Sequence, residues 1–121
     1  MKVINITRSE LLAERVKLAN NFFTRLQGLL FSSSLPTGQG LLLTPCKSIH
    51  SIGMIYPIDA IFLNEELRVV AVEQNFQPWQ MSPVHWQARS CLELPAGTIA
   101  KTGTVSGDQL SLENLVQSKK C

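Results

Sequence analysis

Apolar and polar residues alternate along much of this chain, which is the pattern of short strands with one face toward a core. Residues 2–7 are rich in β-branched side chains, and residues 41–44 form a short apolar run. Residues 57–64 and 67–74 alternate on either side of a polar turn at 64–66, which predicts a β-hairpin. We expect strands in all four segments.

The first strand of this hairpin should carry different side chains on its two faces. The alternation predicts three residues facing one way and the intervening three facing the other way: Ile58, Ala60 and Phe62 against Asp59, Ile61 and Leu63. We expect Ile58 and Phe62 to lie in the interior.

The segment 12–30 is compatible with two different elements. Apolar residues recur every three or four positions along it, which is the stripe of one long amphipathic helix. The alternative is a strand at 14–19 and a helix that begins after Asn20-Asn21, where an asparagine caps the free amides. Periodicity alone favours the single helix.

The C-terminal part predicts a strand, a turn of helix and a final strand. Residues 88–95 alternate as a strand does. Residues 96–103 favour a turn of helix ended by Gly103, because glycine readily takes the left-handed conformation that ends helices. Gly107-Asp108 predicts a tight turn into a last strand within 106–113.

Two segments have the composition of loops. Residues 32–40 hold three serines, a proline and two glycines, and residues 75–87 contain Pro78, Pro83 and both tryptophans without a clean period. Short strands therefore dominate. We predict a β-rich α+β fold: a single small domain with a curled, largely antiparallel sheet or open β-barrel plus one or two short helices.

Composition and charge narrow the class of protein. The chain of 121 residues is 45% hydrophobic and 17% charged, as expected of one folded soluble domain spanning 1–121. The net charge is only +2, from 11 basic and 9 acidic residues, so we expect neither nucleic acid nor membrane as a partner.

Cysteine usage and the N-terminus indicate the compartment. Three cysteines without a C-x-x-C pair favour reduced thiols over a disulfide framework. The N-terminal residues have no uninterrupted apolar run of the kind that signal peptides contain, and no window approaches the roughly 18 apolar residues of a membrane span. We expect a cytoplasmic protein.

Cys46, His50 and Met54 are the first candidates for chemistry. Their spacing of i, i+4 and i+8 places all three on one face of either a helix or a strand. A thiolate, an imidazole and a thioether would suit copper or zinc. Tight sites usually have four ligands, so we favour core packing for these residues and expect no cofactor.

Two kinds of catalytic centre are conceivable from the residue types. Cys46 or Cys91 could act as a nucleophile with either of the two histidines and Asp59. No cysteine-enzyme signature surrounds either thiol. Asp59 and Glu93 could form an acid–base pair, but both lie in predicted strands, where carboxylates more often face solvent or accept backbone hydrogen bonds.

The irregular stretch 75–87 offers the better candidates for ligand contact. It carries Trp79, Met81, His85 and Trp86, and loops with large aromatic side chains often form binding surfaces. The alternative is that the tryptophans fold inward and plug one end of the barrel.

A short sequence, TRLQGLL, raises one further possibility. Arg25 and Gly28 within it are compatible with an anion-binding corner, although a solvated helix face with a close-packing glycine explains them better.

The order of three blocks resembles a known family. FFTRLQGLLF, then GQGLLLTPCKSIHSIGMIYPIDAIFLNEELRVVAV, then RSCLELPAGTIAKTGTVSGDQLSL resemble the family called domain of unknown function 192, over nearly all of residues 14–113 and leaving a polar tail at 114–121. The resemblance implies a compact β-rich fold with a strand before the helix that carries the arginine and glycine, so we expect a strand at 14–19. It maps onto these residues: Arg25, Gly28, Leu29, Leu30, Met54, Pro57, Asp59, Phe62, Leu92, Glu93, Gly97, Gly107 and Asp108.

The same resemblance weakens the chemical hypotheses. Cys46 and His50 belong to the version of this segment that a subgroup of the family has, whereas other members of the family have an aromatic residue near the methionine. The activity of the family is not established, and we expect this chain to have no export signal of the kind that many relatives carry.

We therefore expect a small soluble bacterial-type domain that is non-catalytic and binds a small molecule or a protein at the barrel mouth. The candidate contact residues are His50, Met54, Asp59, Trp79, His85 and Trp86. Asp59 is interpreted mainly as structural, through hydrogen bonds from backbone amides. The alternatives are a cysteine-dependent hydrolase or transferase, and a soft-metal binder for copper or zinc at Cys46, His50 and Met54.

Overall fold

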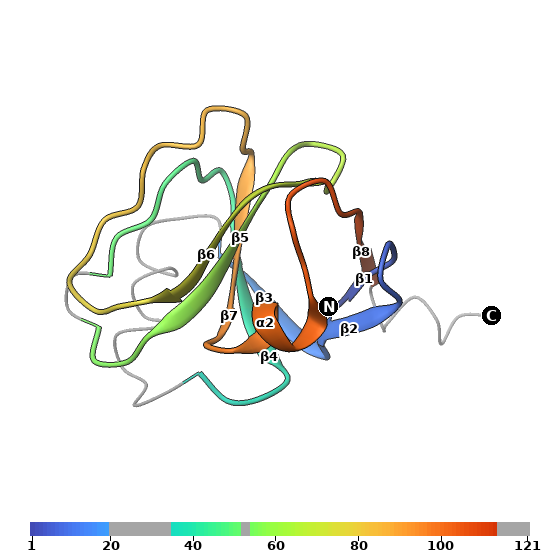
Figure 1. Cartoon of the computed structure of the whole chain (residues 1–121), viewed down its shortest axis with the longest axis horizontal. Coiled ribbons are helices and arrows are strands. Elements are labelled where there is room, and N and C mark those ends of the chain that lie inside the picture. Colours follow the sequence, from blue (N-terminus) through green and yellow to red (C-terminus); the bar gives the residue numbers. More distant parts are fainter. Residues whose placement is uncertain (20–34, 52–53, 114–121) are drawn as a thin grey trace.

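Two β-sheets form the core of the protein (Figure 1). The structure is a computed structural model, and it describes residues 1–19, 35–51 and 54–113. The strands are β1 (Lys2–Asn5), β2 (Glu10–Ala13), β3 (Arg15–Ala19), β4 (Gln39–Leu43), β5 (Ile58–Leu63), β6 (Val69–Phe76), β7 (Ser90–Pro95) and β8 (Leu110–Glu113), and the helix α2 is Thr98–Thr102. One sheet has the order β2-β1-β8 and the other β3-β4-β7-β5-β6. The β-rich α+β class is confirmed, but neither sheet of described strands closes into a barrel.

The pairing is antiparallel except between β3 and β4, which run parallel with Val16 beside Gly40 and Ala19 beside Leu43. The strand β3 decides the ambiguity at 12–30 for the part that is described. A single helix from 12 is wrong, because 10–13 and 15–19 are strands, and the family-based expectation of a strand at 14–19 is confirmed. The expected helix beyond it, with Arg25 and Gly28, lies outside the described residues.

Strand β5 lies inside the larger sheet and is buried along its whole length. Ile58 and Phe62 are 1% and 0% exposed and belong to one hydrophobic cluster, whereas Ile61 and Leu63 belong to a second cluster on the opposite face. The predicted alternation is therefore confirmed. Both faces of this strand pack against hydrophobic neighbours, so that β5 connects the two halves of the core.

The predicted hairpin is present as β5 and β6. Its turn is closed by the Leu67 amide, which donates to the Asn64 carbonyl at 3.0 Å. The side chain of Asn64 also accepts from the amides of Glu66 and Arg68 at 2.9 and 3.0 Å. Asparagine suits this position because its short side chain hydrogen-bonds the backbone of the turn.

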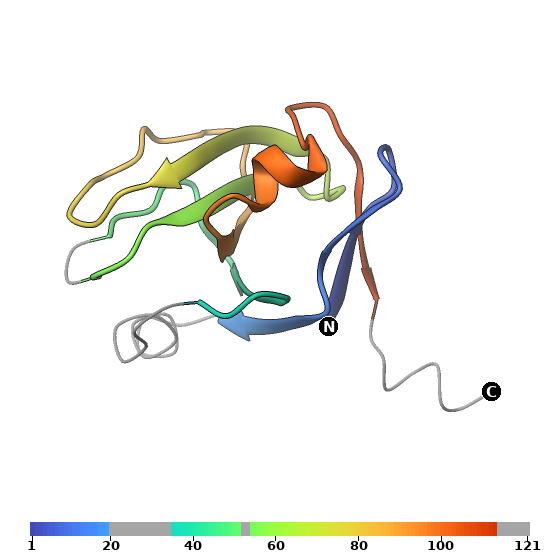
Figure 2. The ribbon, with the colours of Figure 1, turned by 60° about the horizontal axis from the view of Figure 1, so that its bottom comes forward.

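The C-terminal elements also follow the sequence prediction. Helix α2 ends at Gly103, which has a φ of 72°, and the turn before β8 contains Gly107 at a φ of 98°. In space, α2 lies beside β6 of the larger sheet and β2 of the smaller one (Figure 2). The helix thus links the two sheets.

Gly40 in β4 lies against the neighbouring strand β7 and gives a first testable prediction. A Cβ atom on Gly40 would lie 2.9 Å from Leu94 Cδ2 and 3.1 Å from the Glu93 carbonyl oxygen. Because the second contact is to backbone, we expect Gly40→Ala to lower the free energy of unfolding by about 1–2 kcal/mol. Urea unfolding measures this, with Gln39→Ala as the control, and equal losses in the two variants would contradict the prediction.

Candidate functional site

Two loop segments, 44–51 and 77–89, lie side by side at the end of the molecule away from the three-stranded sheet (Figures 1 and 2). We call them the paired loops. Backbone amides of one donate to carbonyls of the other: Ser51 to Gln80 at 2.9 Å, Trp79 to Ser51 at 3.0 Å, Ser82 to Ile49 at 2.9 Å and His85 to Lys47 at 2.7 Å. These bonds hold 77–89 in a defined position although it is neither helix nor strand.

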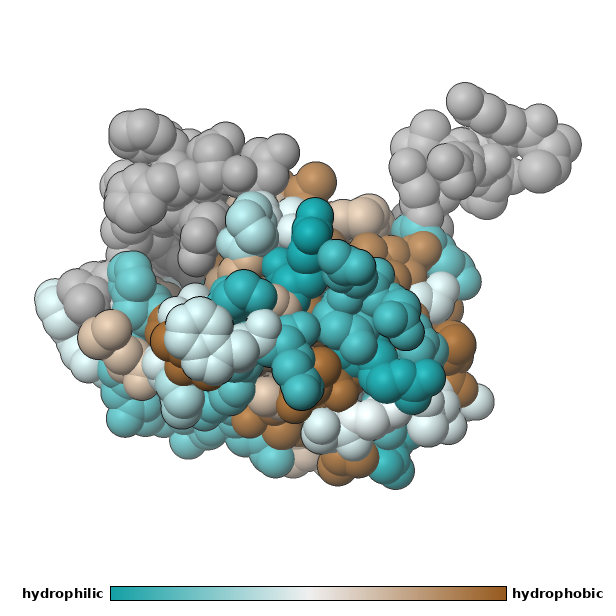
Figure 3. All heavy atoms as spheres, turned by 90° about the horizontal axis from the view of Figure 1, so that it is seen from above, coloured by the Kyte–Doolittle hydropathy of each residue, from teal (hydrophilic) through white to brown (hydrophobic). Residues whose placement is uncertain are grey.

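Four large hydrophobic side chains stand out from the second of the paired loops. Trp79, Met81, Val84 and Trp86 are 69%, 76%, 46% and 77% exposed. We call them the 79–86 surface. Hydrophilic side chains cover the middle of the face seen in Figure 3, with hydrophobic ones in small areas between and beside them. The hypothesis that the tryptophans fold inward as a plug is wrong.

The turn that carries Trp79 is fixed by the buried side chain of Ser51, which is 1% exposed. The Ser51 hydroxyl donates to the Gln77 carbonyl at 2.5 Å and accepts from the Gln80 amide at 2.9 Å. Trp79 has a φ of 64°, which is the left-handed region that bulky residues seldom adopt. Sequence reasoning missed Ser51, because nothing in the sequence connects it to a turn 26 residues away.

The two histidines have different surroundings. His50 is exposed and forms an isolated β-bridge with Met81. His85 is half-buried: its Nε2 lies 3.1 Å from Glu73 Oε2, and its ring centroid lies 4.4 Å from that of Phe62. His85 therefore links the second loop to the core of the larger sheet.

Cys46, His50 and Met54 do not share one face. Cys46 and Met54 are 5% and 4% exposed in the same hydrophobic cluster, whereas His50 is exposed. The expectation failed because the described residues of this segment belong to neither a helix nor a strand, so even spacing does not fix the direction of the side chains. Within the part of the chain that the structure describes, no group of three or more His, Cys, Asp and Glu residues is placed to hold a metal ion.

Asp59 and Glu93 point to opposite faces of the sheet. Glu93 in β7 lies opposite Ala60 in β5, so the neighbouring Asp59 side chain projects from the other face. The hypothesis that Asp59 and Glu93 form an acid–base pair is therefore wrong.

The Glu93 carboxylate also affects a nearby tyrosine. Burial raises the pKa of Tyr56, and the charge of Glu93 raises it further.

The Asp59 carboxylate accepts three backbone amides from outside its own strand. Its Oδ1 accepts from Asn75 at 2.8 Å, and its Oδ2 accepts from Gly97 at 3.1 Å and Ile99 at 2.8 Å. The interpretation of Asp59 as a structural residue that satisfies backbone amides is confirmed.

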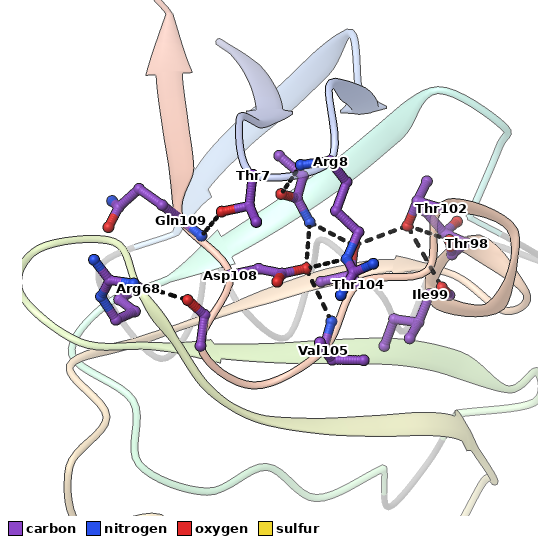
Figure 4. Close-up of polar contacts among 12 residues, drawn as sticks. Thr7, Arg8, Arg68, Thr98, Ile99, Thr102, Thr104, Val105, Asp108 and Gln109 are labelled. Atoms are coloured by element: carbon purple, nitrogen blue, oxygen red, sulfur yellow. Dashed lines mark hydrogen bonds and ion pairs between the residues drawn. The ribbon is translucent and has the colours of Figure 1, made fainter.

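A second buried carboxylate, Asp108, joins the β1–β2 turn to the turn before β8 (Figure 4). Its Oδ2 accepts from Arg8 Nε at 2.7 Å, from Asn5 Nδ2 at 3.0 Å and from the Val105 amide at 3.1 Å. Burial alone would raise the pKa of Asp108, but hydrogen bonds from Arg8, Asn5 and a backbone amide lower it below the ordinary value of 3.8. The family pattern indicated Asp108, whereas nothing in the sequence indicated Arg8.

Among the described residues, two hollows are lined by none of the four side chains of the 79–86 surface. One, of about 340 Å³, is lined by β4 and β7 residues and by the β5–β6 turn, where Arg89 and Glu65 form an exposed ion pair at 3.3 Å. The other, of about 460 Å³, lies between β2 and the segment 95–98. None of the six candidate contact residues named from the sequence lines either hollow.

Comparison with known proteins places the fold in a family. The family model DUF192, described as "Uncharacterized ACR", matches residues 3–112. The chain belongs to the DUF192 family. Its relatives include a UPF0127 protein of Thermococcus sibiricus, 30% identical over 92% of this chain and 74% of that protein, and one of Pyrococcus furiosus, 28% identical over 94% and 100%. These relatives are archaeal, so a bacterial-type origin is not shown.

Two solved structures have the same fold as this DUF192 chain. A protein of unknown function from Novosphingobium aromaticivorans has a TM-score of 0.77 and 22% identity, covering 92% of this chain and 82% of its own. A protein described as a putative transcription regulator, from Sinorhizobium meliloti, has a TM-score of 0.76 and 22% identity, covering 91% and 89%. At this identity the likeness extends to the fold alone.

Among the described residues, no helix is long and apolar enough to cross a bilayer.

Proposed function

We propose that this DUF192 protein is a non-catalytic binding protein that docks a protein partner on the 79–86 surface. The exposure of two tryptophans on one ordered loop carries the proposal. Their side chains alone leave on the order of 300 Å² of largely apolar surface in water. Large apolar side chains that gather exposed on one loop of a folded domain commonly mark interaction sites, and tryptophan is enriched among the residues that dominate interface energies.

The shape of this surface favours a protein over a small molecule. Small ligands usually bury most of their surface in a concave pocket, whereas Trp79, Met81 and Trp86 are each about 70% exposed or more. The two hollows described above contain none of these side chains. A flat or protruding apolar surface is typical of contact with another protein.

The charges around the surface indicate the chemistry of the partner. Neither 44–57 nor 77–89 contains an aspartate or a glutamate, and both contain basic residues. Neighbouring Glu73 and Glu65 pair with His85 and Arg89. Lys47 donates to the carbonyls of Trp86 and Ala88 at 2.9 and 2.8 Å, which leaves one N–H of its ammonium for a partner. The surface therefore fits a partner protein that presents an apolar patch with a carboxylate beside it.

The described residues give a catalytic role less support. Cys46 and Cys91 are buried at 5% and 0% exposure, so neither thiol is presented to a substrate as a nucleophile must be. The Asp59 carboxylate already accepts three backbone amides.

Site-specific photo-crosslinking in cells tests this proposal. A photo-reactive residue at Met81 or Trp86 should give the same protein adduct, and one at the exposed Lys101 of α2 should not. With that partner purified, Trp79→Ala and Trp86→Ala should each weaken binding by about tenfold or more, as at other aromatic hot spots. Binding unchanged in both variants, equal adducts from position 101, or adducts with lipid alone would overturn the proposal.

A further inference from the structure

The backbone at Trp79 is unfavourable for the residue that occupies it. A φ of 64° places the chain in the left-handed region, where the Cβ atom of an L-residue crowds the following carbonyl oxygen. Glycine, asparagine and aspartate tolerate this region best. Because the Trp79 side chain is 69% exposed, its own burial offers little compensation for this conformation.

The surrounding contacts explain how the conformation is held. Ser51 uses its amide, its carbonyl and its hydroxyl on the turn: the amide donates to Gln80 O, the carbonyl accepts from Trp79 N, and the hydroxyl bridges Gln77 O and Gln80 N. The Gln77 amide is also satisfied within the turn, by Gln80 Oε1 at 3.0 Å. Ser51 itself is buried, so the turn is attached to a fixed point.

We infer that Ser51 is a positioning residue, which holds the backbone of Trp79 in a strained turn so that its Cα–Cβ bond, and with it the indole, projects in one direction before any partner arrives. This inference rests on the proposed function. Strained backbone is found where the surrounding structure fixes it, frequently at binding sites. Ordering a side chain in advance removes part of the entropy that association would otherwise lose. The partner that such a residue fits has a preformed apolar pocket deep enough for an indole.

The first test measures how far the motion of the Trp79 indole is restricted in the purified protein. The chain has two tryptophans, so Trp86→Phe makes Trp79 the only indole emitter and Trp79→Phe does the same for Trp86. Adding Ser51→Ala should lower the time-resolved fluorescence anisotropy of Trp79 and leave that of Trp86 unchanged. Equal changes for both tryptophans, or no change for Trp79, would overturn the inference.

The second test measures the strain without altering Ser51. At position 79, asparagine tolerates the left-handed region and valine does not, so Trp79→Asn should melt roughly 3–5 °C higher than Trp79→Val. The same two substitutions at Trp86, which is not among the positive-φ residues, supply the matched control. If asparagine and valine differ no more at 79 than at 86, the turn stores no strain and the inference fails.

The two tests separate this inference from the proposed function. Anisotropy and melting use the protein alone, so they decide the role of Ser51 whether or not crosslinking finds a partner. With a partner in hand, Ser51→Ala should weaken its binding several-fold, less than Trp79→Ala does. Loss of binding in the tryptophan variants with full binding in Ser51→Ala would leave the proposed function standing and remove the positioning role.

Discussion

Replacing Asp59 by alanine is expected to lower the free energy of unfolding by about 3–5 kcal/mol. Asp59 is 1% exposed, and its two oxygens accept the amides of Asn75, Gly97 and Ile99. Without the carboxylate, three donors in a water-poor region lose their acceptor, and each unsatisfied group costs roughly 1–3 kcal/mol.

The effect should be large because Asp59 also fixes an irregular position in β6 and the turn before α2. Asn75 and Gly97 have φ values of 51° and 98°, so both are in the left-handed region, Asn75 at a register shift in the pairing of β6 with β5 and Gly97 at the turn. Gly97 immediately precedes α2, and Asn75 lies near the end of β6. One buried side chain thus holds the end of the hairpin and the start of the helix against the central strand.

Guanidinium unfolding followed by far-UV circular dichroism measures the Asp59 effect. Asp59→Asn should lose less than Asp59→Ala, because the amide retains one acceptor oxygen. Glu66→Ala, in the exposed hairpin turn, serves as the control and should change little. A loss for Asp59→Ala indistinguishable from that of Glu66→Ala would return Asp59 to the list of functional candidates.

The elements that the sequence predicted well are those whose local chemistry and tertiary surroundings agree. The β5–β6 hairpin has alternating strands and an asparagine that bonds its own turn, and both features are local. Gly103 and Gly107 are required by positive φ angles of 72° and 98°, so the residue type itself marks the end of a helix and a turn. Such signals can be read without knowing what packs on them.

The N-terminal region was ambiguous because its apolar spacing fits a helix. Val16 and Ala19 are both buried, three positions apart, as helical spacing would require. They are nevertheless in β3, because parallel pairing with β4 provides backbone partners that no local pattern reveals. Tertiary pairing overrode local periodicity, and the family resemblance was needed to choose the strand.

Part of the candidate site could be predicted from the sequence, and there is a physical reason why the rest could not. Aromatic residues on a proline-containing loop indicated a contact surface, and the structure leaves Trp79 and Trp86 exposed there. Cys46, His50 and Met54 were grouped by even spacing, which has meaning only inside a regular element. Ser51 was missed because its importance depends on a partner segment that is remote in the sequence.

Removing the carboxylate of Asp108 should cost about 2–4 kcal/mol near neutral pH, and the cost should shrink in acid. Asp108 is 4% exposed and accepts from Arg8, from Asn5, which is 0% exposed, and from the Val105 amide. In Asp108→Ala these donors lose their acceptor, and the contact between the β1–β2 turn and the turn before β8 is broken. Thr104 keeps its bond from Asn5 Nδ2 at 3.0 Å, so the loss is not complete.

The sign of the pH dependence follows from the direction of the pKa shift. The pKa of Asp108 in the folded protein lies below the ordinary 3.8, so the folded state binds this proton less tightly than the unfolded chain. Its stabilisation is therefore present in full above the unfolded value and is lost as the pH falls through the folded one. Urea unfolding at a series of pH values should show Asp108→Ala far less stable than the native protein near neutrality and progressively closer to it in acid. Glu113→Ala removes a more exposed carboxylate, 3.6 Å from Lys2, and is the matched control. A difference between Asp108→Ala and the native protein that stays constant down to strong acid would show that the charge of Asp108 is not what holds the two turns together.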